Sequence, residues 1–278
     1  MSIPARRADL LDVELPKAAW SRSGRPTLGR ITRTLFASTL VLLGLAVAVP
    51  AISVGLLVAG VAGFFLIPVI TDLLLQRGEP AIVGATAASA KRQLEGLEER
   101  VLVKAFAPDA WVTLQRGRLL LAKGDGREAA QAFADTARII GDPTRASLVS
   151  AQARALMLAG DRAGARTHLA ALAERNELSP RDHLDLGTIM LGEAANADEA
   201  REHLQAAHEG LAGHPQASAA LAVALTRAGD IDRAREMLEA AEAGADDDDT
   251  LAADAIKKAR KALRSVKDGG SKKKRRRG

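Results

Sequence analysis

The 278-residue sequence contains no cysteine and no tyrosine, and its only aromatic residues are five phenylalanines and two tryptophans. A chain without cysteine has no disulfide, no thiolate zinc site and no cysteine nucleophile. Aromatic residues at 3% are few for an enzyme pocket or for a surface on which nucleic-acid bases stack. Hydrophobic residues at 47% nevertheless allow a sizeable core.

Common catalytic motifs are also missing. The sequence has no P-loop, nucleophile elbow, zinc-protease motif or Rossmann glycine pattern. His203 and His208 are five positions apart, too far round a helix to grip one metal ion, and both are interpreted as solvent-facing. The run Asp246–Asp249 lacks the spaced ligands of a calcium loop and is typical of a solvated linker. We therefore expect no enzyme and no catalytic, cofactor or metal site.

The net charge of +5 is divided unevenly along the chain. Residues 1–33 carry +4, residues 34–106 carry 0, residues 107–249 carry −9 and residues 250–278 carry +10. This division indicates a basic front, a neutral apolar block, an acidic body and a basic tail.

The apolar block is the longest feature without charge. Residues 34–71 include 21 Leu, Ile, Val or Phe, worth about −8 kcal/mol on a membrane-insertion scale. One straight helix of 38 residues would be about 57 Å long, nearly twice the hydrocarbon thickness. Because Pro50 interrupts it, two helices, Ile31–Val49 and Ala51–Thr71, are predicted to form a transmembrane hairpin or a hairpin buried in one leaflet. A cleaved signal ending near Ala46-Val47-Ala48 and a buried helix of a soluble protein are the less favoured alternatives.

Basic residues flank the apolar block on both sides. Arg30 and Arg33 precede it, and Arg77, Lys91 and Arg92 follow it. By the positive-inside rule both ends face the cytoplasm. The expected localisation is therefore an integral membrane protein with the bulk of the chain cytoplasmic, as in a bacterial inner membrane. Four glycines in the block, Gly44, Gly55, Gly60 and Gly63, would let two helices approach closely.

A repeat follows at a period near 34 residues. Ala129, Ala165, Ala200 and Ala234 are separated by 36, 35 and 34 residues, and a bulky apolar residue follows each after four positions: Phe133, Leu169, Leu204 and Leu238. Gly-Asp pairs precede three of these alanines and are typical of one helix ending and the next beginning. The pattern predicts stacked helix pairs that share one core.

These residues resemble the tetratricopeptide repeat family over residues 110–245. The family has a small residue in the first helix of each pair, matched by Gly117, Ala153, Gly187 and Ala222, and a proline near the end of the unit, matched by Pro143, Pro180 and Pro215. The departures are that the aromatic positions are mostly Leu or Ala, and that Ala195-Asn196 replaces Gly-Asp in the third unit.

The resemblance implies a groove lined by the first helix of each pair. Carried over to this sequence, it places six residues in or near a partner groove: Gln115, Arg118, Arg154, Asp185, Thr188 and Arg227. Arg118 and Arg154 each follow a small position by one residue, so they are candidates for contact with an acidic peptide. Solvent-exposed arginines without such a role are an equally acceptable interpretation.

The basic end of the chain divides into a helix and a tail. Thr250 caps a predicted helix, Leu251–Val266, that covers the last repeat. After Gly269 and Gly270 come six cations, Lys272, Lys273, Lys274, Arg275, Arg276 and Arg277, which suit a polyanion or the anionic membrane surface. With no aromatics among them, nucleic acid is an unlikely partner.

The sequence therefore predicts an all-α chain in six parts. These are a basic segment (1–30), the transmembrane hairpin (31–75), a helical connector (76–109), about four tetratricopeptide-like helix pairs (110–249), a capping helix (250–267) and a polybasic tail (268–278). The leading hypothesis is a membrane-anchored scaffold that binds a protein or peptide partner in the solenoid groove and needs no cofactor. The alternatives are membrane complex assembly or envelope biogenesis through hairpin oligomerisation, and a tether to polyanions or membrane lipids through the tail.

Overall fold

The computed structural model describes residues 28–83, 109–193, 197–245 and 250–275, with a few isolated positions between 83 and 109. Over these residues it contains α-helices and no strand, so the predicted all-α class is confirmed. The chain divides into two compact units, residues 1–160 and 161–278, and each is described by itself. The basic front 1–27, most of the connector, the run Asp246–Asp249 and Arg276–Gly278 lie outside the described residues.

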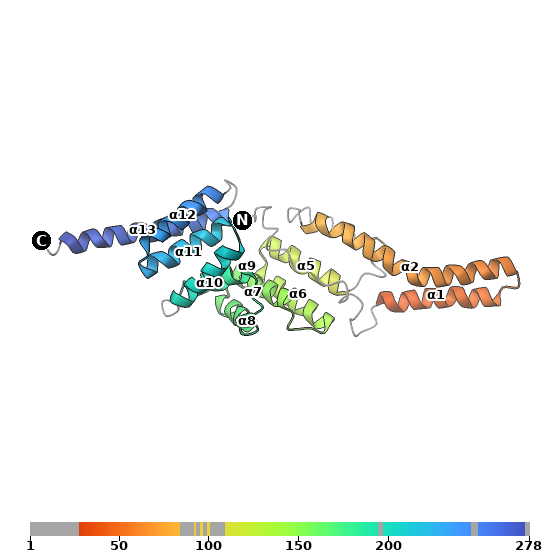
Figure 1. Cartoon of the computed structure of the whole chain (residues 1–278). Helices are drawn as coiled ribbons and strands as arrows, with labels where there is room; N and C mark the ends of the chain where they lie inside the picture. The colour runs from red at the N-terminus through yellow and green to blue at the C-terminus, as the bar shows by residue number, and fades with distance from the viewer. Residues whose placement is uncertain are drawn as a thin grey trace. The chain divides into compact units, whose positions relative to one another are not determined.

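The first unit begins with a helical hairpin of α1 (Leu28–Ala46) and α2 (Pro50–Val83), which lie side by side in Figure 1. Pro50 opens α2, where its missing N–H costs nothing because that donor has no partner inside the helix. The helices approach closely at glycines: a Cβ on Gly60 would stand 3.1 Å from the Ala37 carbonyl oxygen. Ser53 Oγ also donates to the Gly44 carbonyl oxygen at 2.6 Å. The expected close approach is therefore present at Gly44 and Gly60, but not at Gly55, where an added Cβ would have no atom within 4 Å.

The membrane assignment of this hairpin needs correction. Within the residues that the structure describes, no helix is both long enough and apolar enough to cross a membrane. In α1, Arg30 and Arg33 occupy the first turns, and the charge-free remainder, Thr34–Ala46, spans only about 20 Å against a hydrocarbon thickness of about 30 Å. A transmembrane hairpin is therefore not supported, and on this finding the predicted integral membrane localisation is wrong.

Three further helices of the first unit are described: α5 (Asp109–Lys123), α6 (Gly126–Ile140) and α7 (Ala146–Leu158). Phe133 of α6 is completely buried among leucines and alanines of all three helices. A Cβ on Gly117 of α5 would lie 2.8 Å from the Phe133 ring, so glycine is needed for the two helices to approach this closely. The small residue and the bulky residue of the repeat pattern therefore meet across one helix pair.

The second unit contains the helices α8 (Arg162–Glu174), α9 (Pro180–Met190), α10 (Ala197–Gly210), α11 (Pro215–Ala228), α12 (Ile231–Gly244) and α13 (Thr250–Arg275). Its crossing residues, Ala165, Ala200 and Ala234, are all 0% exposed. A Cβ on Gly187 would stand 2.7 Å from Leu204 Cγ, which repeats the contact between Gly117 and Phe133 in the first unit. The repeated sequence pattern thus gives the same packing contact in both units.

Helix starts in the second unit use the predicted aspartate caps. Asp161 accepts a hydrogen bond from the Gly164 N–H at 2.9 Å, and Asp230 accepts one from the Arg233 N–H at 3.3 Å. Gly160 and Gly229, which precede these caps, have φ values of +81° and +84°. Because L-residues rarely adopt such angles, each Gly-Asp pair ends one helix and begins the next.

The last helix, α13, is longer than the capping helix expected from the sequence. It starts at Thr250 but continues to Arg275, through the glycines that indicate a linker. Lysine and arginine favour helix, and the six-cation run that follows the glycines is made only of these residues. Towards its start, Ile256 and Ala259 are buried against Ala219 and Ala222 of α11. The first half of α13 is therefore part of the packed core of the second unit.

Candidate functional site

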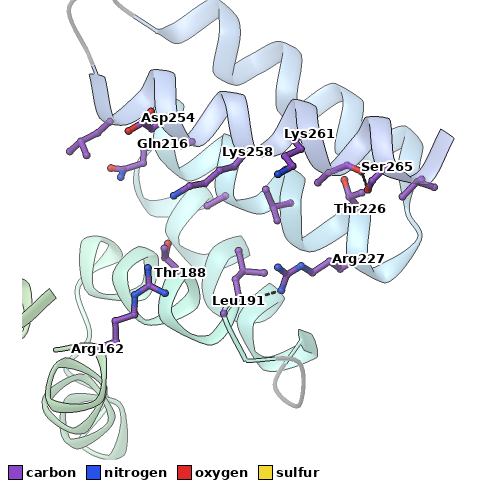
Figure 2. A pocket seen from close by; sticks show the side chains of 17 residues that line it. Arg162, Thr188, Leu191, Gln216, Thr226, Arg227, Asp254, Lys258, Lys261 and Ser265 are labelled. Atoms are coloured by element: carbon purple, nitrogen blue, oxygen red, sulfur yellow. Dashed lines mark hydrogen bonds between the residues drawn. The ribbon is translucent and has the colours of Figure 1, made fainter. Parts of the chain in front are cut away.

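A pocket of about 840 Å³ lies in the second unit between α9, α11 and α13 (Figure 2). Its apolar lining residues are Leu191, Ala220, Val223, Leu251, Ala255, Ala262 and Val266. Its polar and charged lining residues, together with one glycine, are Arg162, Thr188, Gly192, Gln216, Thr226, Arg227, Asp254, Lys258, Lys261 and Ser265. An apolar surface with a limited set of polar groups is the usual character of a binding site.

The helical period of α13 explains how it forms one wall. Leu251, Ala255, Lys258 and Ala262 recur every three or four positions and line the pocket. Ala252, Ile256 and Ala259 lie on another stripe of the same helix and are 6% exposed or less. One stripe therefore fixes α13 to its unit, while a neighbouring stripe faces the pocket.

Two arginines approach the turn that follows α9. Arg227, at the end of α11, donates from its guanidinium to the Leu191 carbonyl oxygen. Arg162, the first residue of α8, lies close by: a Cβ on Gly192 would be 3.7 Å from its Nη1. The last carbonyl groups of a helix carry partial negative charge, so both cations are favourably placed there. One of the five N–H donors of Arg227 goes to this carbonyl.

The pocket carries an excess of positive charge. Its ionisable lining residues are four cations, Arg162, Arg227, Lys258 and Lys261, and one anion, Asp254. Lys258, Lys261 and Asp254 are exposed positions of α13. The pocket is thus suited to a partner that presents both apolar and acidic groups.

The structure brings together only two of the six predicted groove residues. Thr188 and Arg227 both line the pocket. Asp185 lies one turn before Thr188, is 6% exposed and forms an ion pair with Arg181, with 3.7 Å between Nε and Oδ1. Asp185 is therefore a buried neighbour of the pocket and not part of its lining.

The other three predicted groove residues belong to the first unit and do not line this pocket. Gln115 is 0% exposed, Arg118 is 4% exposed and Arg154 is 9% exposed. The Arg118 guanidinium donates a hydrogen bond to Gln115 Oε1 at 3.3 Å, and both residues belong to α5. With so little exposed surface, these side chains have little contact area to offer a partner in this conformation.

Sequence reasoning missed Arg162, Lys258 and Lys261. On sequence alone, contact with negatively charged partners was assigned to the six-cation tail. The cations that lie among the apolar positions earlier in α13 were not considered. Lys258 and Lys261 are three positions apart, next to the apolar positions 255 and 262, which is the available sequence signal. Of the tail itself, Lys272–Arg275 lie within α13, and Arg276 and Arg277 lie outside the described residues.

A histidine pair lies elsewhere in the second unit, between α9 and α10. His183 Nδ1 and His203 Nδ1 are 2.9 Å apart, and the ring centroids are 5.1 Å apart. Burial lowers the pKa of His183, and the neighbouring His203 lowers it further. Burial is also the largest cause of the lowered pKa of His203, which Glu199 and Glu202 oppose. The interpretation of His203 as solvent-facing is thereby corrected, because its partner comes from another helix, 20 positions away in sequence.

His208 also has a hydrogen-bonding neighbour. Its Nδ1 is 3.1 Å from Ser218 Oγ, in a part-buried contact. Over the described part of the chain, no group of three or more histidine, aspartate or glutamate side chains is arranged to hold a metal ion. His203 and His208 therefore make separate contacts with different helices.

One comparison with known proteins, a family model, agrees with the repeat pattern. Residues 193–259, from the turn before α10 to the first part of α13, match the family model for the tetratricopeptide repeat. The chain is also similar to a solved structure described as YrrB, a TPR protein with an unusual peptide-binding site. The identity is 21%, the match covers 69% of this chain and 91% of that chain, and the TM-score is 0.45. No match was found among curated proteins.

Proposed function

We propose that the second unit is a protein-interaction module that holds a peptide segment of a partner in the pocket between α9, α11 and α13. The pocket itself is the observation that carries this proposal, because it combines about 840 Å³ with an apolar surface and a charged rim. We also propose that the role is binding and not catalysis.

The match to the tetratricopeptide repeat model supports this assignment. It covers α11 and the first ten residues of α13, which contribute two walls of the pocket. In a stack of helix pairs, each pair contacts only its neighbours, so the stack presents an extended surface instead of a closed active site. A groove of this kind is suited to a linear segment of a partner chain.

The test uses a variant that fills the pocket without disturbing the core. Thr188→Trp places a large ring at an exposed position in the pocket wall (Figure 2). The full chain and this variant serve as baits for affinity purification, and Thr167→Trp, at an exposed position of α8 that does not line the pocket, is the matched control. We expect Thr188→Trp to lose the partner that both other baits retain. Equal recovery by all three baits would exclude the pocket as the binding site.

A second candidate function, self-association through the hairpin, is favoured by a different observation. Of the 14 exposed large hydrophobic side chains in the described residues, 13 lie on α1, α2 or the turn between them, and the other is Val266. Exposed large apolar side chains concentrated on one part of a molecule favour an interaction site there. A second copy presents the same uncharged surface, so two hairpins would be mutually compatible.

This second candidate is tested by the oligomeric state of the full chain. Leu42→Glu with Val58→Glu introduces charge at positions that are 66% and 61% exposed. Val266→Glu, at 44% exposure in the other unit, is the control. We expect sedimentation to show an oligomer that the hairpin variant dissociates and the control leaves intact. A monomeric wild-type chain would eliminate the candidate.

A further inference from the structure

The charge of the pocket is opposite to that of the repeat helices of the second unit. Residues 161–249 hold 8 basic and 19 acidic residues, a net charge of −11, whereas the pocket carries four cations and one anion. The acidic helices repel negative groups, whereas the pocket cations and the other cations of α13 attract them. The electrostatic contrast therefore directs an acidic ligand towards α13, which forms one wall of the pocket.

The four cations stand on opposite sides of the pocket. Lys258 and Lys261 project from α13, and Arg162 and Arg227 lie across from them near the end of α9 (Figure 2). The arginine guanidinium matches carboxylate geometry, and lysine supplies a mobile point charge. Carboxylates along a bound segment could therefore meet cations on both walls.

Apolar side chains between these cations give the pocket its second property. Val223 of α11 and Ala255 of α13 belong to this apolar surface. The pocket-lining residues include no aromatic side chain, so the pocket offers nothing on which a nucleic-acid base would stack. Among polyanions, the lining thus favours a peptide with mixed acidic and apolar residues over a single-stranded nucleic acid.

From this combination we infer that the pocket binds an acidic peptide in which glutamate or aspartate alternates with apolar residues. The lining of α13 from Leu251 to Val266 is about 22 Å long at 1.5 Å per residue. That length accommodates six or seven extended residues at about 3.3 Å each. The inference rests on the proposed function, since it names the class of partner that the same pocket takes.

The experiment measures fluorescence anisotropy of labelled heptapeptides with the full chain. The probes alternate leucine with glutamate, serine or lysine, and a seven-nucleotide oligothymidylate is the fourth probe. Lys258→Glu with Lys261→Glu reverses two pocket charges. Lys257→Glu with Arg264→Glu makes the same charge change at exposed positions of α13 that do not line the pocket. The basic tail is present in every variant, so its contribution to binding is constant.

We expect the glutamate peptide to bind most tightly and the pocket variant to weaken it at least about tenfold, because charge-matched contacts become repulsive. The control variant should change the affinity by less than about twofold, because its charges are solvent-exposed, do not line the pocket and are screened by salt. Equal losses in both variants would overturn the inference in favour of general attraction to a basic helix. Tighter binding of the oligothymidylate would overturn it in favour of nucleic acid.

The Thr188→Trp variant separates failure of this inference from failure of the proposed function. Binding of the serine or lysine peptide that Thr188→Trp abolishes would preserve the pocket as a peptide site and refute its acidic preference. Absence of binding by all three peptides, or binding that Thr188→Trp leaves unchanged, would refute both. Circular dichroism of each variant checks that the helices remain folded.

Discussion

The hairpin and the repeat helices use apolar residues in opposite ways. In the hairpin, leucines and valines such as Leu42 and Leu45 are 66% and 70% exposed. In the second unit, Leu169, Leu184 and Leu204 are all 1% exposed or less. Apolar content alone therefore does not define a core, since a core also requires a second layer against which the apolar face packs.

The largest expected effect comes from truncating a core leucine. Leu204→Ala should lower the free energy of unfolding by about 2–5 kcal/mol, because it leaves a cavity at a completely buried position. In a chain whose hairpin no second copy covers, Leu42→Ala, at 66% exposure, should change it by about 0.5 kcal/mol or less. Urea unfolding followed by circular dichroism compares the two. A large loss for Leu42→Ala would mean that a partner or a second copy covers the hairpin in solution.

Glycine substitutions sharpen the same comparison. Gly187→Ala should cost about 1–3 kcal/mol, since its new methyl group would stand 2.7 Å from the buried Leu204 Cγ. Gly55→Ala has no atom within 4 Å of the new methyl group and should stabilise α2 by up to about 1 kcal/mol. Thermal unfolding measures both effects. If Gly55→Ala were destabilising, the space beside Gly55 on α2 would not be open as the structure shows it.

Two aspartates before helices allow a smaller comparison between the units. Asp161→Ala should cost about 1 kcal/mol, because Asp161 accepts a hydrogen bond from the Gly164 N–H. Asp125, which precedes α6 in the first unit, makes no side-chain capping bond. Its alanine variant should therefore lose less stability in the same unfolding measurement. Equal losses would show that the cap contributes through charge near the helix start and not through the bond.

The smallest effect concerns acid pH and the histidine pair. Burial lowers the pKa of His183 and His203 in the folded chain. Below the ordinary histidine pKa of 6.5, the two histidines therefore bind more protons in the unfolded chain than in the folded chain. The stability contributed by the neutral pair is complete above that pH and decreases as the pH falls below it. Asp182, Glu199 and Glu202 face the pair and reduce the effect, since they favour the protonated rings.

Unfolding midpoints measured from pH 7.5 to pH 5 test this dependence. The second unit should lose stability on acidification, and His203→Gln should make its profile flatter. His168→Gln, on α8, is the control histidine. A wild-type profile as flat as that of His203→Gln would remove the histidine pair as a source of pH sensitivity.

The repeat pattern could be predicted from sequence because its determinants are local. The alanine and the bulky residue four positions later share a helix face, and glycine followed by aspartate marks a helix boundary through φ and capping. The segment 193–259 that matches the tetratricopeptide repeat model includes the predicted residues Ala200 and Leu204. The helices and their small crossing residues could be predicted because the residues that determine them are only a few positions apart in the sequence.

The pocket could not be predicted in the same way. Thr188 was found through the resemblance, but Lys258 and Lys261 lie about 70 positions further on and join it only because α13 packs on α11. For Arg118 and Arg154 the prediction failed in the other direction. The resemblance placed both in the partner groove, but in the structure they are only 4% and 9% exposed. A shift of one position turns a helical side chain by about 100° and decides whether it faces a partner or its own core.

By itself, the sequence determined that the chain is helical, that it repeats with a period near 34 residues, and that a neutral apolar hairpin precedes an acidic body. Tertiary structure alone decided which charges surround the pocket, which histidines meet and how far α13 extends. The physical reason is range: helix periodicity and capping act within one or two turns, whereas a pocket exists only where distant helices pack together.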